Sequence, residues 1–223
     1  MYNVRVERSA GYAGIAFIVL SAVGVFLPGI PPPPSASPID VSAFVGSHHT
    51  TWLFSAWIGF PAVAFFLWFS VQLRAFLRMT PGQDDGLPTY MLAAAIAMST
   101  MILVDVTAQI LLGWLSAAQL DAPTIRLLWT FFNAGAAVMF APATIVVFTA
   151  SHSARRHASM PSWANYWGYL AALGCGVASL SIFFSSGFLQ MAGAGSLLIG
   201  LLPFSIWVIL ASITLIRHPK AAA

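Results

Sequence analysis

Long apolar stretches separated by short polar ones run through the whole chain. Six of these stretches carry few charged residues and approach or exceed the roughly 20 residues that a helix needs to cross a hydrocarbon core. They occupy residues 11–27, 52–73, 91–115, 127–149, 164–188 and 192–216. A transmembrane β-strand would alternate polar and apolar residues, whereas the run 65–69, Phe-Phe-Leu-Trp-Phe, is apolar throughout. We therefore predict an all-α integral membrane bundle of six transmembrane helices.

The composition agrees with this pattern. The 223 residues are 59% hydrophobic and 7% charged, with a mean hydropathy of +0.86, against roughly 25% charged residues in soluble domains. This excludes most soluble classes. The connections are short, so we expect one transmembrane domain over residues 1–223. The longest connection, 28–51, contains four consecutive prolines and is predicted to be an extended spacer across the outer face, without helix through most of its length.

The first span has a second interpretation, as a cleaved signal peptide. Arg5 and Arg8 precede it, and the small residues Ser35, Ala36 and Ser37 follow it, as in a cleavage region. Because a proline directly after this patch is a poor neighbour for cleavage, we interpret the segment as a transmembrane helix.

Basic residues in the short loops predict the orientation of the bundle. Eight of the nine fall on one side of the six spans: Arg5, Arg8, Arg74, Arg78, Arg155, Arg156, Arg217 and Lys220. Only Arg126 falls on the other side. Both termini are therefore expected to be cytoplasmic. The basic residues are scattered over four loops, so they indicate an insertion signal and not a nucleic-acid surface.

The cysteine and histidine positions limit the cofactor chemistry. Cys175 is the only cysteine, which excludes an intramolecular disulfide, a redox pair and a thiolate zinc cage. We expect it to be a buried small residue at a helix contact in the fifth span. The five histidines lie at span ends or in loops, so a haem held between two histidines inside the bundle is not expected. We predict no cofactor.

His48 and His49 precede the second span on the outer face, and Asp40 lies upstream. Two interpretations are open for this pair. Adjacent helical residues point about 100° apart, so both could bind one metal ion only outside a helix or with a third ligand from another loop. Alternatively, they are interfacial histidines near Trp52.

Asp105 is the one acidic residue near the middle of a predicted span. A charged carboxylate at that depth costs about 3 kcal/mol on insertion scales, and no basic residue is available at the same depth. We expect Asp105 to be protonated at neutral pH or to face a water-filled cavity. Two roles are open: a structural hydrogen bond between helices, or a proton, cation or ligand site.

Other polar residues extend this candidate site. Helical spacing places Gln109 and Ser116 on the face of Asp105. Asn133 of the fourth span is predicted at the same depth as Gln109, because each lies about 8 Å outward of its span midpoint at 1.5 Å per residue. A hydrogen bond between Gln109 and Asn133 is therefore expected.

Prolines and small residues predict how the helices bend and pack. Pro61, Pro142 and Pro203 lie inside the second, fourth and sixth spans and should kink them; their similar placement hints at a repeated helix pair. Glycines and alanines are frequent in the fourth and fifth spans, which should pack closely. The second span is bulky on all sides, so we expect it to face lipid or a partner subunit, including a second copy of the chain.

Catalytic arrangements known for membranes are missing from this sequence. No histidine accompanies a serine at membrane depth, Asp105 has no second aspartate, and the motif His-Glu-x-x-His does not occur. An active site would need loop residues such as Asp40, His48, His49 and Asp121. We therefore expect a non-catalytic protein.

The first span ends in Leu-Pro-Gly at 27–29, a proline-rich loop follows, and the second span closes with Leu-Arg-Ala-Phe-Leu-Arg at 73–78. This layout resembles a broad family of six-span bacterial membrane proteins of uncharacterised function. The resemblance implies six helices and a bacterial plasma membrane. The expected role is an accessory subunit of a membrane complex or a lipid or small-molecule binding protein. The alternatives are a small proton- or cation-coupled transporter that uses Asp105, and an outer-face metal site at His48 and His49.

Overall fold

The computed structural model describes residues 4–78, 86–117 and 121–217, and within these ranges the chain is helical with no strand. The long helices are α1 (Val4–Phe26), α3 (His49–Leu77), α4 (Leu87–Ala117), α5 (Ala122–Val138), α6 (Phe140–Arg156), α7 (Ser162–Ser179) and α9 (Leu202–Arg217). Shorter elements are α2 (Pro38–Ser47), the 3-10 turn η1 (Leu180–Phe183), α8 (Ala194–Ser196) and the π-helical segment η2 (Leu197–Leu201). Together they form six segments long and apolar enough to cross a membrane. The prediction of an all-α six-span bundle is confirmed.

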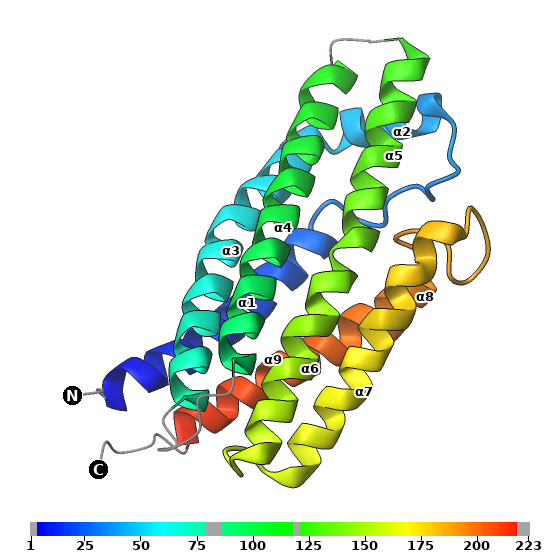
Figure 1. Ribbon diagram of the computed structural model, residues 1–223. Helices are drawn as coiled ribbons and strands as arrows, with labels where there is room; N and C mark the ends of the chain where they lie inside the picture. The colour runs from blue at the N-terminus through cyan, green and yellow to red at the C-terminus, as the bar shows by residue number, and fades with distance from the viewer. Residues whose placement is uncertain (1–3, 79–85, 118–120, 218–223) are drawn as a thin grey trace.

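Each span packs against its neighbours in the sequence, and the last span returns to the first. Helix α1 packs on α3, α3 on α4, α4 on α5 and α6, α6 on α7, α7 on α9, and α9 on α1 (Figure 1). Short connections between antiparallel helices produce this order, because each helix can reach only an adjacent position. The beginning of α1 and the end of α9 consequently lie at the same end of the bundle, which we call the terminal end (Figure 1).

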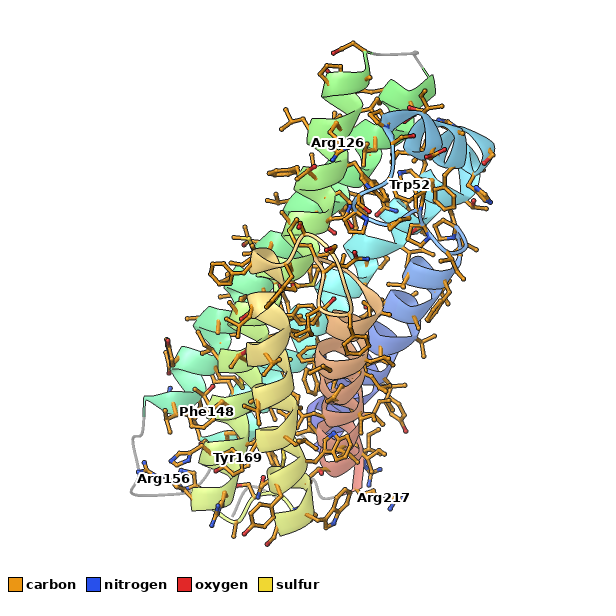
Figure 2. The ribbon with its side chains drawn as sticks, turned by 90° about the vertical axis from the view of Figure 1, so that its right-hand side faces the viewer. Trp52, Arg126, Phe148, Arg156, Tyr169 and Arg217 are labelled. Atoms are coloured by element: carbon orange, nitrogen blue, oxygen red, sulfur yellow. The ribbon has the colours of Figure 1, made fainter. Side chains whose placement is uncertain are left out.

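The basic residues are divided between the two ends as the sequence predicts. Arg156 and Arg217 lie at the terminal end, and Arg126 lies toward the opposite end (Figure 2). Helix α3 also ends at the terminal end, with Arg74 in its last turn. Lys220 lies outside the described residues, and the side chain of Arg5 is also outside the described part.

Aromatic rings from three helices fill the centre of the bundle. The ring centroids of Phe17 and Phe66 are 4.7 Å apart, and each lies 6.4 Å from the ring centroid of Phe204. All three side chains are buried, and they join α1, α3 and α9. Aromatic pairs at such separations add to the dispersion energy of the core.

The aromatic residues of α3 occupy two different faces. Four are buried against other helices: Trp52, Phe66, Phe69 and Phe76. Five are exposed on the outside of the bundle: Phe54, Trp57, Phe60, Phe65 and Trp68. The aromatic bulk therefore lies on an inner and an outer face, and contact of the outer face with lipid or a partner stays a prediction. Counting aromatic residues could not distinguish the two faces, because both faces are equally apolar in a membrane helix.

Two of the three intramembrane prolines accompany a change in helix geometry. The predicted fourth span consists of α5 and α6, which meet at Met139, three residues before Pro142. Pro203 is the second residue of α9, which begins directly after the π-helical segment η2. A proline provides no N–H for the carbonyl four residues earlier, which explains why the regular ladder changes there. Helix α3 continues through Pro61 without interruption.

The small residues of α7 bring it close to its neighbours, as predicted. A Cβ atom at Gly174 would collide with the Ile199 carbonyl oxygen of η2, and one at Gly168 would collide with Ser151 Oγ of α6. Cys175 is buried, and its Sγ lies 3.6 Å from the Gly200 carbonyl oxygen. Cys175 is thus a small residue at a helix contact, in agreement with the sequence.

Two segments differ from their predicted form. The fifth span ends at Phe183, so the residues predicted as its last part, 184–188, belong to the irregular connection to α8. The proline-rich segment is less irregular than expected, because residues 38–47 form α2 and α3 begins at His49. Pro38 is at the first turn of α2, where its missing N–H is harmless. The Ser37 side chain accepts a hydrogen bond from the Asp40 backbone N–H (3.2 Å) and starts the helix.

Candidate functional site

Asp105 faces α5 from the middle of α4. A Cβ atom built on Gly135 would lie 2.6 Å from Asp105 Oδ1, so the carboxyl group lies directly against the backbone of α5. Asp105 Oδ1 is buried and has no hydrogen-bond partner among the described residues. The Asp105 side chain therefore lies between α4 and α5.

The next residue of α4 makes a similar contact on the other side. A Cβ atom built on Gly59 of α3 would lie 2.6 Å from Val106 Cγ2. Thus α4 lies between two glycines of neighbouring helices at the level of Asp105. Glycine allows this close approach because it has no side chain. The carboxyl group is held in place by helix packing and not by an ion pair with a described residue.

The boundary between α5 and α6 lies one turn away from Asp105. Gly135, which contacts Asp105, is four residues before Met139, where α5 gives way to α6. The Met139 N–H still donates to the Gly135 carbonyl (3.2 Å). Pro142 has no N–H to offer the carbonyl of Val138. The carboxyl group and the helix break are therefore neighbours, which the sequence alone did not reveal.

Gln109 connects α4 to α3. Its Nε2 donates to the Trp52 carbonyl (3.2 Å) and to Ser55 Oγ (3.0 Å), and Trp52 Nε1 donates back to the Gln109 carbonyl (2.8 Å). Ser55 Oγ donates in turn to the Gly24 carbonyl of α1 (2.6 Å). Three helices are joined by this network, which is buried and largely satisfied within the chain.

The predicted hydrogen bond between Gln109 and Asn133 is wrong. Asn133 Nδ2 instead donates to the Trp129 carbonyl in its own helix (2.7 Å), and Trp129 Nε1 donates to the Pro33 carbonyl (3.3 Å). Counting residues along a helix predicts depth in the membrane, but it does not give the rotation of the helix about its axis. Gln109 faces α3, so it was not available to α5.

Ser116 is the fourth residue of the predicted polar site. Its Oγ is buried without a hydrogen-bond partner in the described part of the chain. It lies on α4 about seven residues beyond Gln109, close to 10 Å along the helix axis. The structure therefore separates the predicted set into a satisfied residue, Gln109, a residue bonded within α5, Asn133, and the two unsatisfied oxygens of Asp105 and Ser116.

The histidine pair at the start of α3 does not converge on one point. The His48 ring lies 4.7 Å from the Phe44 ring, and its Nδ1 is 2.9 Å from the Phe44 carbonyl oxygen. The His49 ring packs edge-on against Trp114 of α4 at 5.9 Å. Asp40 Oδ2 accepts a hydrogen bond from Ser37 Oγ (2.7 Å).

The described residues offer no third ligand beside these histidines. Among residues 4–78, 86–117 and 121–217, no three His, Cys, Asp or Glu side chains gather as a metal site. Asp121 accepts hydrogen bonds from Thr124 at the start of α5 and acts as a helix cap. The metal hypothesis at His48 and His49 stays a prediction without a third ligand.

Comparison of the chain with protein-family models, with curated proteins and with solved structures gives no match. The resemblance to six-span membrane proteins consequently rests on the layout of the apolar helices alone.

Proposed function

We propose that this multi-pass membrane protein is a non-catalytic binding protein that holds a lipid or another small molecule through Asp105. The observation that carries this proposal is the buried Asp105 Oδ1, which lacks a hydrogen-bond donor among the described residues. Nearby amide groups are already engaged, because Gln109 and Asn133 bond to backbone or side-chain oxygens. A ligand that offers a hydroxyl, amine or amide donor would satisfy the carboxyl oxygen.

Native mass spectrometry of the protein in mild detergent tests this proposal. We expect wild-type protein to retain a bound small molecule, Asp105→Asn to retain less, and Asp105→Leu to retain none. The control is Gln109→Leu, which removes a polar side chain from the same helix but leaves the carboxyl group intact. If all variants retain the same molecules, or if none is ever bound, binding through Asp105 is wrong.

A role as accessory subunit is supported by a different surface. Trp57 and Trp68 are exposed on the outer face of α3, and their indole N–H groups make no hydrogen bond with a described residue. Indole N–H groups inside a bilayer favour a partner with an acceptor. Purification in mild detergent should then recover a second membrane protein or a second copy. Trp57→Leu with Trp68→Leu should release it, and recovery unchanged by both substitutions would contradict this role.

Coupled transport is the competing function, because Asp105 lies one turn from the break between α5 and α6. A break of this kind can change helix direction and expose a carboxyl group to either side. Proton flux into proteoliposomes, followed with a pH-sensitive dye under an imposed membrane potential, tests this function. Transport requires that Asp105→Asn abolish the flux; unchanged flux with altered stability excludes it.

The proposal also includes the membrane in which the protein lies and the side on which its termini lie. The basic residues at the terminal end support cytoplasmic termini in a bacterial plasma membrane. Labelling of single cysteines placed at either end tests the orientation, since the natural Cys175 is buried. If a cysteine placed at the terminal end were labelled from outside in intact cells, the cytoplasmic location of the termini would be wrong.

A further inference from the structure

A group of basic and aromatic side chains lies where α6 and α7 meet the terminal end of the bundle. We call it the α6–α7 basic cluster: Phe148, His152, Arg155 and Arg156 of α6 with Tyr166 and Tyr169 of α7. Figure 2 shows Phe148, Tyr169 and Arg156 near one another at this end. None of these residues takes part in the site around Asp105, so the cluster needs its own explanation.

Contacts within and between the two helices position five of the six residues of the cluster, all except Arg156. His152 Nδ1 and the Tyr169 hydroxyl oxygen are 3.2 Å apart, at hydrogen-bond distance. The Phe148 ring is stacked on the His152 ring at 5.8 Å. The Arg155 guanidinium carbon lies 5.3 Å from the centre of the Tyr166 ring, which is a cation–π distance. Preorganised side chains lose less conformational entropy when they bind a ligand.

The positive charge of the cluster has no acidic counterpart among the residues that the structure describes. The sequence contains no Asp or Glu after Asp121, and Asp84 and Asp85, between α3 and α4, lie outside the described residues. Arg155 and Arg156 are exposed, and neither makes an ion pair with any residue that the structure describes. Guanidinium groups form their strongest hydrogen bonds with carboxylates and phosphates. An external anion is therefore the partner that this chemistry fits.

The cluster also changes from apolar to charged along the membrane normal. Phe148 is exposed on the bundle surface, and Arg155 lies seven residues further along α6, about 10 Å nearer the terminal end. Trp163 and Tyr166 are exposed at the beginning of α7, where aromatic residues typically mark the membrane interface. An amphiphile with a negative head and an apolar tail matches this gradient, whereas a free anion would use only the charged part.

We propose that the α6–α7 basic cluster binds the headgroup of an anionic phospholipid. Arg155 and Arg156 bind the phosphate oxygens, Tyr166 fixes the guanidinium of Arg155, and Phe148 packs against the first part of an acyl chain. The lipid is held between two helices, at a site separate from Asp105.

Lipid-dependent stability of the full-length protein tests this assignment. Purified protein is titrated with phosphatidylglycerol or with phosphatidylcholine, and lipid adducts are counted by native mass spectrometry alongside the melting temperature. We expect phosphatidylglycerol to bind and stabilise wild-type protein more than phosphatidylcholine. The double variant Arg155→Gln with Arg156→Gln should lose about fivefold in phosphatidylglycerol affinity for each arginine replaced.

Matched variants separate a specific site from general surface charge. The double variant Arg126→Gln with Arg217→Gln removes the same net charge elsewhere and should keep wild-type affinity for phosphatidylglycerol. The charge-conserving variant Arg155→Lys with Arg156→Lys should bind at an intermediate level, and its melting temperature without lipid shows that the fold is intact.

Three results would overturn the proposal. The first is equal binding of phosphatidylglycerol and phosphatidylcholine by wild-type protein. The second is an equal loss of affinity in the two double glutamine variants, which would indicate diffuse surface charge. The third is stabilisation by inorganic phosphate as large as that by phosphatidylglycerol, which would indicate an anion site without a lipid.

Discussion

The contact between α7 and the π-helical segment of the last span can be tested with two glycines that lie two residues apart. At Gly174, an added Cβ would collide with the backbone carbonyl oxygen of Ile199. At Gly176, the nearest atom to an added Cβ is Thr144 Oγ1 at 3.8 Å, an ordinary van der Waals contact. Both positions lie inside the same helix, so the gain in helix propensity from alanine is the same for both.

The difference between the two variants therefore isolates the collision. Overpacking costs about 1–3 kcal/mol in a well-packed core, and a backbone carbonyl cannot rotate away as a side chain can, so we expect about 3 kcal/mol at Gly174. Alanine propensity offsets at most about 1 kcal/mol of this cost. We predict that Gly174→Ala is destabilised by about 2 kcal/mol, whereas Gly176→Ala is neutral or slightly more stable.

The assay is reversible unfolding in bicelles or mixed detergent micelles, with the free energy of unfolding measured for wild type and both variants. Equal free energies for the two variants would refute the reasoning. That result would mean that α7 and the segment Leu197–Leu201 are not in backbone contact, and that Pro203 does not position the Ile199 carbonyl against α7.

Three further predictions use the same unfolding measurement. Trp52→Phe should cost about 2 kcal/mol of unfolding free energy, because it removes one interhelical hydrogen bond and part of a buried ring. Trp57→Phe should cost less than about 0.5 kcal/mol, because the Trp57 side chain is 58% exposed. Equal costs would place Trp57 in an interface. Gly135→Ala should cost about 1–2 kcal/mol and also reduce ligand retention, since its Cβ would lie 2.6 Å from Asp105 Oδ1; unchanged retention and stability would contradict the contact. Ser212→Ala should be neutral or stabilising by up to about 1 kcal/mol, because the buried hydroxyl has no partner among the described residues; a clear destabilisation would indicate a hydrogen bond.

The hydrophobic pattern predicted the class of fold correctly, and it did so from length alone. Charge-poor stretches long enough to cross a bilayer correspond to the six observed spans, because a membrane imposes a minimum length that few soluble helices meet. The pattern was less reliable at segment ends. It extended the fifth span to 188, although residues 184–188, Phe-Ser-Ser-Gly-Phe, form a loop, since a lack of charge reports compatibility with lipid and not backbone geometry.

The candidate site was predicted in part. Asp105 was singled out because an acidic residue in a span is costly, and its position against Gly135 agrees with an inward orientation. The partner of Gln109 was predicted wrongly, since depth along a helix can be counted from sequence but rotation about the axis cannot. The bond between His152 and Tyr169 was also missed; both residues lie near span ends at similar depth, which is a signal shared by many pairs.

The sequence by itself determined the solvent of this protein, the number of its spans and the separation of its basic residues, because these depend on the length and order of apolar segments. Only the tertiary structure decided which faces meet: Gln109 with α3 and not α5, Asp105 against a glycine one turn from a helix break, and Phe66 inward but Trp68 outward on one helix. In a bilayer the inside and the outside of a bundle are both apolar, so hydrophobicity does not orient a helix. Orientation comes from close packing at small residues and from polar groups that must find partners within the chain.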